Sequence, residues 1–287
     1  MMPVIRVAHL FPVLDGKLIE LLRSLDAREW ERPTIAGPWT VKDVAAHLLD
    51  TQQRQLRVAH GEPLPSPPVI RSNADLVAFI NRLNADGVER YRRLDTPDLI
   101  ARMEAGGSES ASYYASLDPF ANALFPVSWA GEETSPNWFH VAREFTERWH
   151  HQQQIRLATN RPGIMTPELY YPVLDCFMRA LPFAYRDRTA APDSLVQVNV
   201  AGDCGGSWYL HYGSVDGRTI SSPHAAGEWR LVPAPRGTLV CEITMPEAIA
   251  WRIFTKGISR TEAAPHVRVD GDAGLGSHIL ATIAIVG

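Results

Sequence analysis

The sequence has few cysteines, few lysines and no long apolar run. Its three cysteines, Cys176, Cys204 and Cys241, lie far apart, which excludes a disulfide framework and a CxxC metal knuckle. We therefore expect a reducing, cytoplasmic setting. No apolar stretch reaches the ~18 residues of a membrane-spanning helix. The opening residues lack the apolar core and cleavage site of a secretory signal, so we expect none.

The charge balance narrows the classes of function further. The 287 residues include 28 basic and 32 acidic side chains, a formal net charge of −4, and only three of the basic residues are lysines. This weak acidity argues against a general nucleic-acid-binding protein. With 45% hydrophobic and 21% charged residues, the composition is that of a globular protein. The length predicts two domains.

Helical periodicity dominates the first 160 residues. Thr40 and Asp43 predict a capping box, with Asp in the role of Glu, and the proline-rich segment 61–68 predicts a loop. Four or five helices joined by short loops predict an up-and-down bundle over residues 1–160. The expected helices span residues 7–25, 40–59, 72–95 and 136–159, with another after Pro97.

The pattern changes after the turn-forming segment 160–163. Alternating, β-branched and aromatic segments predict strands, and glycine, aspartate and proline lie between them. We therefore predict an α+β domain over residues 161–287, an antiparallel sheet with helices on one face. The expected strands are 194–200, 207–212, 228–232, 238–243 and a short edge strand at 267–269, and the expected helices are 167–185, 246–254 and 275–283.

Two helical segments carry residues that can ligate a metal. Glu147 and His151 are four residues apart and share one helix face, although such a pair is often only a charged surface. His47 lies on an apolar stripe, where a lone histidine is more often a core residue. A bundle can bring the three together, and three protein ligands leave the open position of a catalytic zinc site. Nickel or iron would accept the same ligands.

Several motifs match a known family in order and spacing. They are the Trp-Thr helix start leading to histidine (39–48), the Trp-Ala-Gly segment (127–131) and the Arg-x3-Glu-x3-His segment (143–151). On these residues the sequence resembles the mycothiol-dependent maleylpyruvate isomerase family, within the DinB/YfiT-like superfamily of metal-binding bundles. Members often append a domain resembling sterol carrier proteins, and segments 257–260 and 270–272 match its glycine-arginine and Gly-Asp features.

The resemblance implies His47, Glu147 and His151 as metal ligands and mycothiol as a thiol cosubstrate. It also suggests that Arg260 of the C-terminal domain acts in catalysis, facing the metal cleft. Arg143, beside the ligand pair, is our candidate for binding the cosubstrate. One departure concerns Gln154, which stands where many members carry an aspartate beside the ligand histidine. Ligand tuning by a neighbouring carboxylate is therefore in question.

Three hypotheses of function follow. The first is a metal- and thiol-dependent S-transferase or cis–trans isomerase acting on a small, carboxylate-bearing electrophile. The second is a metal-dependent hydrolase that uses metal-bound water on the same ligands. The third is a non-catalytic protein that binds small molecules or partners on the same bundle. We rank the first hypothesis highest, then the third, then the second. We expect a small molecule and a thiol as partners, and neither nucleic acid nor a membrane. The oligomeric state stays open.

Overall fold

The computed structural model describes residues 2–62, 69–214 and 227–286. The chain divides into two compact units, and each is made of separate segments. We call the first the bundle unit (Arg6–Ala121, Val141–Met165 and Val286–Gly287). The second is the sheet unit (Met1–Ile5, Asn122–His140 and Thr166–Ile285). Residues 122–140, which the sequence assigns to the bundle, group with the sheet unit.

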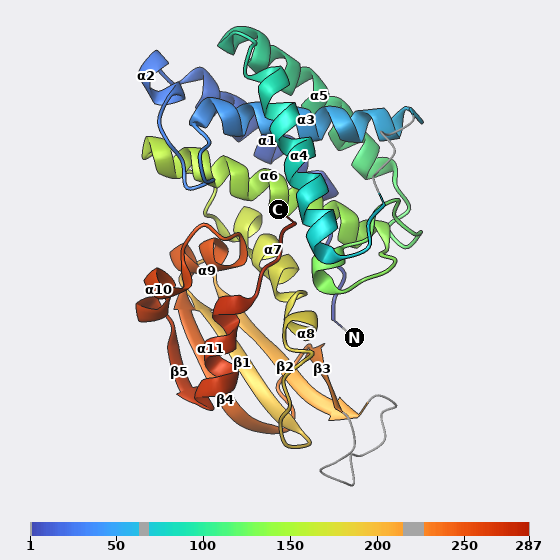
Figure 1. The fold of residues 1–287 in the computed structure, drawn as a ribbon, viewed down its shortest axis with the longest axis vertical. Coiled ribbons are helices and arrows are strands. Elements are labelled where there is room, and N and C mark those ends of the chain that lie inside the picture. The colour runs from blue at the N-terminus through green and yellow to red at the C-terminus, as the bar shows by residue number, and fades with distance from the viewer. Residues whose placement is uncertain (1, 63–68, 215–226, 287) are drawn as a thin grey trace. The chain divides into compact units, whose positions relative to one another are not determined.

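The bundle contains the five long helices that the periodicity predicts (Figure 1). They are α1 (Phe11–Arg23), α3 (Val41–Ala59), α4 (Asn73–Tyr91), α5 (Thr96–Ser116) and α6 (Asn137–Thr159), with a short α2 (Ala27–Trp30) and a 3-10 turn η1 (Ala8–Leu10). The helices α3 and α4 run antiparallel, since Arg54 contacts Asn84 while Arg92 contacts Asp43. Most of the predicted loop 61–68 lies outside the described residues.

Side-chain caps fix where the bundle helices begin. The predicted capping box is present: the Asp43 amide donates to Thr40 Oγ1, and the Thr40 amide donates to Asp43 Oδ2. Ser72 and Asp95 cap α4 and α5 in the same way with one side-chain bond each. A cap satisfies amides that the first helical turn leaves unpaired. The cap at Thr40 thereby sets the phase of α3 and the face on which His47 lies.

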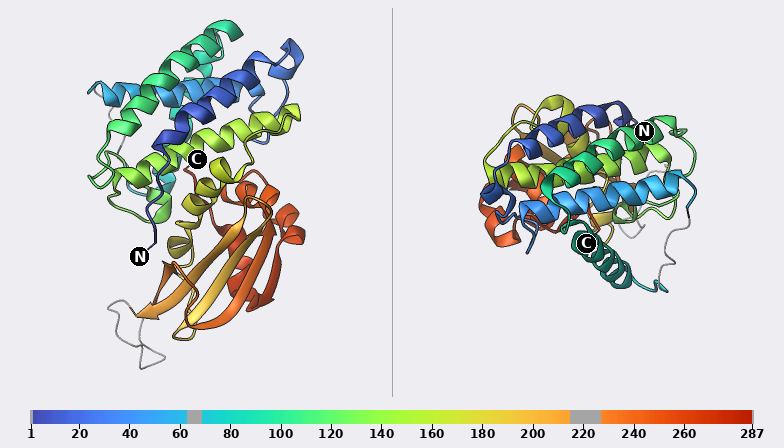
Figure 2. Two further views of the ribbon diagram at one scale, coloured as in Figure 1. Left: turned by 180° about the vertical axis from the view of Figure 1, so that it is seen from behind. Right: turned by 90° about the horizontal axis from the view of Figure 1, so that it is seen from above.

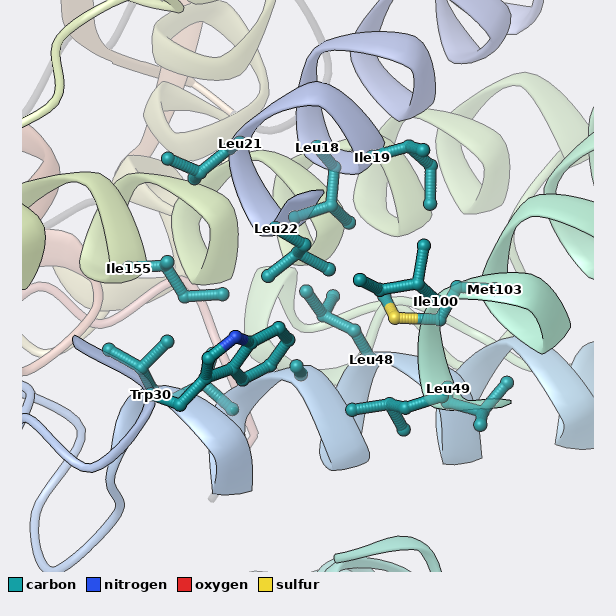
Figure 3. Close-up of a cluster of buried hydrophobic side chains, with 14 residues drawn as sticks. Leu18, Ile19, Leu21, Leu22, Trp30, Leu48, Leu49, Ile100, Met103 and Ile155 are labelled. Carbon is teal, nitrogen blue, oxygen red and sulfur yellow. The ribbon is translucent and has the colours of Figure 1, made fainter. Parts of the chain in front are cut away.

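Apolar side chains of four bundle helices and of α2 meet in one core (Figure 3). Leu22 of α1 and Leu48 of α3 lie near its centre, beside Trp30, and Ile155 of α6 closes one side. Each is at most 5% exposed. Burying a side chain of this size contributes roughly 1.5–3 kcal/mol. The apolar stripes found in the sequence thus hold α3 and α6 together at the level of the candidate ligands.

The sheet unit contains five strands near the predicted positions, in the order β3-β2-β1-β4-β5. They are β1 (Ser194–Ala201), β2 (Gly206–Ser214), β3 (Gly227–Val232), β4 (Thr238–Pro246) and β5 (Arg268–Gly271). Three neighbouring pairs are antiparallel, but β1 and β4 pair in parallel. The α+β fold class is confirmed, and the sheet is mixed rather than wholly antiparallel. The hairpin β2–β3 separates β1 from β4 along the chain, and this connection allows β4 to run parallel to β1 as its neighbour.

Helices cover one face of this sheet (Figure 1). Trp208 of β2 donates through Nε1 to Asp175, and the Tyr185 ring packs on Trp229 of β3. The predicted helix 167–185 divides into two parts. Among the described helices of the sheet unit, none lies over the opposite face (Figure 2, left). The helices are α7 (Pro167–Met178), α8 (Leu181–Ala184), α9 (Glu247–Phe254), α10 (Arg260–Ala263) and α11 (Ala273–Ser277), with 3-10 turns η2 (Ser128–Ala130), η3 (Ala264–His266) and η4 (His278–Ala281).

Among the described residues, no helix combines the length and apolar character needed to cross a membrane.

Candidate metal centre

Three side chains that the sequence singles out lie together in the bundle unit. His47 comes from α3, and Glu147 and His151 come from successive turns of α6. One ligand atom from each lies within 4.8 Å of the other two. The two imidazole rings are 4.6 Å apart between centroids, and His151 Nε2 lies 3.7 Å from Glu147 Oε2. This is the spacing of groups that can converge on one ion.

Burial controls the protonation of this cluster. Removal from water lowers the pKa of His47 well below its usual range, and the neighbouring His151 adds to the effect. Burial likewise lowers the pKa of His151 to about 3. Both imidazoles are therefore neutral near pH 7, which is the form that binds a metal. Burial raises the pKa of Glu147, and the nearby His151, Arg143 and Arg54 offset part of that rise.

Gln154 orients one of the imidazoles. Its Oε1 lies 2.8 Å from His151 Nδ1, and an amide oxygen can only accept, so the histidine is protonated at Nδ1. The lone pair of His151 Nε2 is then left for the cluster. The residue that departs from the family pattern thus performs the orienting task, with a neutral amide in place of a carboxylate.

The residues present fit a divalent metal ion. His47 is 3% exposed, and its Nδ1 is buried with no hydrogen-bond partner among the described residues. An unpaired buried polar atom costs free energy unless something else binds it. Two neutral imidazoles and one carboxylate are a donor set that zinc accepts. Glu147 remains 29% exposed at its side chain, so the cluster is reachable on that side.

Two further aromatic groups border the cluster. The Trp39 ring lies 4.8 Å from the His47 ring and 6.3 Å from the His151 ring, between centroids. Trp39, the first residue of the Trp-Thr motif, therefore forms a wall of the site. The His150 ring lies 4.0 Å from the His151 ring, between centroids. Its Nδ1 donates to the Thr146 carbonyl, and burial lowers its pKa to about 4.

The two arginines predicted from the sequence lie in different surroundings. Arg143, one turn before Glu147, pairs with Glu144 at 2.7 Å and is 16% exposed at its side chain. Burial and the charge of Glu144 raise the pKa of Glu147. The charge of Arg143 lowers it, as His151 does more strongly. Arg260 belongs to the sheet unit, where it is exposed in the first turn of α10, just after the Ser259 cap. Its catalytic role stays a prediction.

One charged residue near the cluster is absent from the sequence predictions. Arg54 of α3 pairs with Asp50 and donates to Asn84 of α4, and its charge acts on both His47 and Glu147. Its position seven residues after His47 places it on the same helix face. That spacing is the sequence signal that could have found it.

Together these observations define a class: a helix bundle with a two-histidine, one-carboxylate cluster, joined to an α+β unit. The family model described as the mycothiol maleylpyruvate isomerase N-terminal domain matches residues 13–156. The chain therefore belongs to the mycothiol maleylpyruvate isomerase family. A comparison with curated proteins finds no match.

Two solved structures share the fold over both units. One is a crystal structure of the mycothiol-dependent maleylpyruvate isomerase, at 14% identity and a TM-score of 0.50. The other is a mutant of that enzyme in which a histidine is replaced by alanine, at 12% identity and a TM-score of 0.52. Each alignment covers 95% of both chains. At these identities the likeness establishes the fold alone.

Proposed function

We propose that this protein is a metal-dependent enzyme that uses a low-molecular-weight thiol of the mycothiol type. Its reaction would be S-transfer to, or cis–trans isomerisation of, a small electrophile that bears a carboxylate. The observation that carries the proposal is the convergence of His47, Glu147 and His151 within 4.8 Å. The family membership and the printed names of the two structural neighbours support the thiol and the reaction class.

The chain's own cysteines are poor candidates for the nucleophile. All three are buried and lie in the sheet unit, and burial raises the pKa of Cys204 and of Cys241 to about 11. A thiolate is the reactive form, so Cys204 and Cys241 are unreactive near pH 7. Cys176 is fully buried. The nucleophile is then a thiol supplied from outside, as expected in a reducing cytoplasm.

His47, Glu147 and His151 would hold the metal, with zinc preferred and nickel or iron acceptable. When bound, a divalent metal supplies one thing: it favours the thiolate over the thiol. The neutral imidazoles ligate without first losing a proton, and Gln154 keeps His151 in the ligating tautomer. Arg143, beside the ligand pair in the sequence, would contact the thiol cosubstrate. Arg260 would contact the reacting substrate, as the family resemblance suggests.

The isomerisation balances without another reactant. The thiolate sulfur forms a bond to one carbon of a cis double bond conjugated to a carbonyl, and the π electrons move to the carbonyl oxygen. The former double bond is now single and rotates. The electron pair then returns, the carbon–sulfur bond breaks, and the thiolate leaves the trans product. In S-transfer, a proton instead quenches the adduct, which is released.

The test is a turnover assay on zinc-loaded protein with maleylpyruvate as the probe substrate. The rate is measured with mycothiol, with glutathione and without thiol, and again after removal of metal by a chelator. The proposal predicts turnover that requires thiol and metal together and that returns when zinc is restored. Turnover independent of thiol would support the hydrolase hypothesis instead. Absence of any thiol-dependent turnover would contradict the proposal and leave the binding-protein hypothesis.

A further inference from the structure

Arg54 lies close to the ligand cluster within the bundle unit. It follows His47 by seven residues on α3, which is two helical turns along the same face, or about 10.5 Å of helix rise. The Arg54 side chain therefore projects from the face of α3 that carries His47.

The surrounding residues hold this guanidinium in one place. Asp50, 4% exposed, places Oδ2 2.9 Å from Arg54 Nε, and Asn84 Oδ1 accepts from Nη2 at 2.9 Å. The Asp50 carboxylate fits because residue 87 of α4 is glycine: a Cβ there would collide with it. Two helices thus fix the orientation of Arg54 before any ligand arrives. Such fixing reduces the entropy lost on binding.

One edge of the guanidinium remains available. Nη1 has no hydrogen-bond partner among the described residues, and the side chain is 22% exposed. Two other arginines of the bundle are more fully engaged. Arg148 is paired with Asp15 at 2.6 Å, and Arg156 donates to three backbone carbonyls. A guanidinium held on two sides and open on a third is suited to a carboxylate, which it can bind through paired donors.

We propose that Arg54 binds the carboxylate of the electrophilic substrate beside the metal centre, with Asp50 and Asn84 as its positioning residues. The inference rests on the proposed function for the identity of the substrate. The binding claim itself is wider: a small dicarboxylate binds at Arg54 whether or not the protein turns it over.

The test compares Arg54→Gln with Arg57→Gln, a matched control one turn further along α3 whose side chain is exposed. Zinc content is measured first, and both variants are expected to retain it. Zinc-loaded proteins are then titrated with maleate by calorimetry. Charge-assisted hydrogen bonds are worth about 1.5–3 kcal/mol, so Arg54→Gln should weaken binding roughly tenfold or more. Arg57→Gln should change it less than about twofold.

A conservative variant separates ligand binding from helix packing. Arg54→Lys keeps the charge but loses the planar donor pair, so it should recover part of the affinity. With maleylpyruvate, Arg54→Gln should raise KM far more than it lowers kcat. Equal maleate affinity in wild type and Arg54→Gln would overturn the inference. If wild type binds maleate through Arg54 but shows no thiol-dependent turnover, the proposed function fails and this inference stands.

Discussion

Two of the buried polar clusters in the bundle differ in what neutralises them. In the first, Arg148 donates to Asp15 at 2.6 Å and lies 5.0 Å above the Phe11 ring. The second holds His47, Glu147 and His151, and its His47 Nδ1 is buried with no hydrogen-bond partner among the described residues. The first cluster is complete within the protein. We propose that an ion from outside completes the second cluster and that this cluster is the functional one.

The largest expected effect is on the complete cluster. Asp15→Ala removes the partner of Arg148 and leaves a buried charge unpaired, so unfolding should become easier by about 3–5 kcal/mol. Zinc content should not change, because neither residue belongs to the ligand cluster. Denaturant unfolding and metal analysis check the two statements.

The double variant Asp15→Ala/Arg148→Met is the control for this experiment. Removing both charges should restore much of the lost stability, since no charge is then left uncompensated. A single variant that loses less than about 1 kcal/mol, or one that loses its zinc, would contradict the division into two independent clusters.

The next effect concerns the residue that orients His151. Gln154→Ala removes the acceptor for His151 Nδ1, so zinc affinity should fall roughly tenfold to a hundredfold. Competition with a chromophoric chelator measures this affinity. Gln154→Glu keeps an acceptor at the same place and should retain most of it. Unchanged affinity in the alanine variant would show that Gln154 does not orient the ligand.

A further effect is a pH dependence of the metal-free protein. His47, His150 and His151 have lowered pKa values, so between about pH 4 and 6.5 the unfolded chain binds protons that the folded chain does not. Stability should therefore fall as pH falls, by up to about 1.4 kcal/mol per pH unit for each imidazole. Glu147, with its raised pKa, acts in the opposite direction at the low end of this window.

One variant isolates a single contribution to this slope. His150→Gln removes one imidazole outside the proposed ligand set, so the loss of stability between pH 6.5 and 5 should become shallower. Urea unfolding at a series of pH values measures the slope in both proteins. An identical slope would mean that His150 is not held neutral in the folded protein.

Much of the fold follows from local patterns. The 3.6-residue periodicity and the Thr40–Asp43 box predict the helix bundle, and alternating segments predict the strands. The parallel pairing of β1 with β4 was not predictable in this way. Which strands become neighbours depends on contacts between segments about 40 residues apart. No local periodicity reports those contacts.

The same distinction applies to the candidate site. The i,i+4 spacing places Glu147 and His151 on one face, and the shared core of α3 and α6 brings His47 to them. Arg54 is different, because its partner Asn84 and the space at Gly87 come from α4. Neither helix alone has a sequence pattern that predicts how α3 and α4 align with each other. The ligand roles of the three cluster residues remain a proposal for experiment.

The central claim is that the cluster of His47, Glu147 and His151 holds one metal ion. Plasma mass spectrometry of purified, untagged protein tests it most directly, on wild type beside Glu147→Ala, with Asp15→Ala as a control outside the cluster. The account predicts close to one zinc or nickel per chain in wild type and in the control, and loss of the metal in Glu147→Ala. Wild type that holds no metal even after zinc is added, or a Glu147→Ala variant that keeps full occupancy, would contradict it.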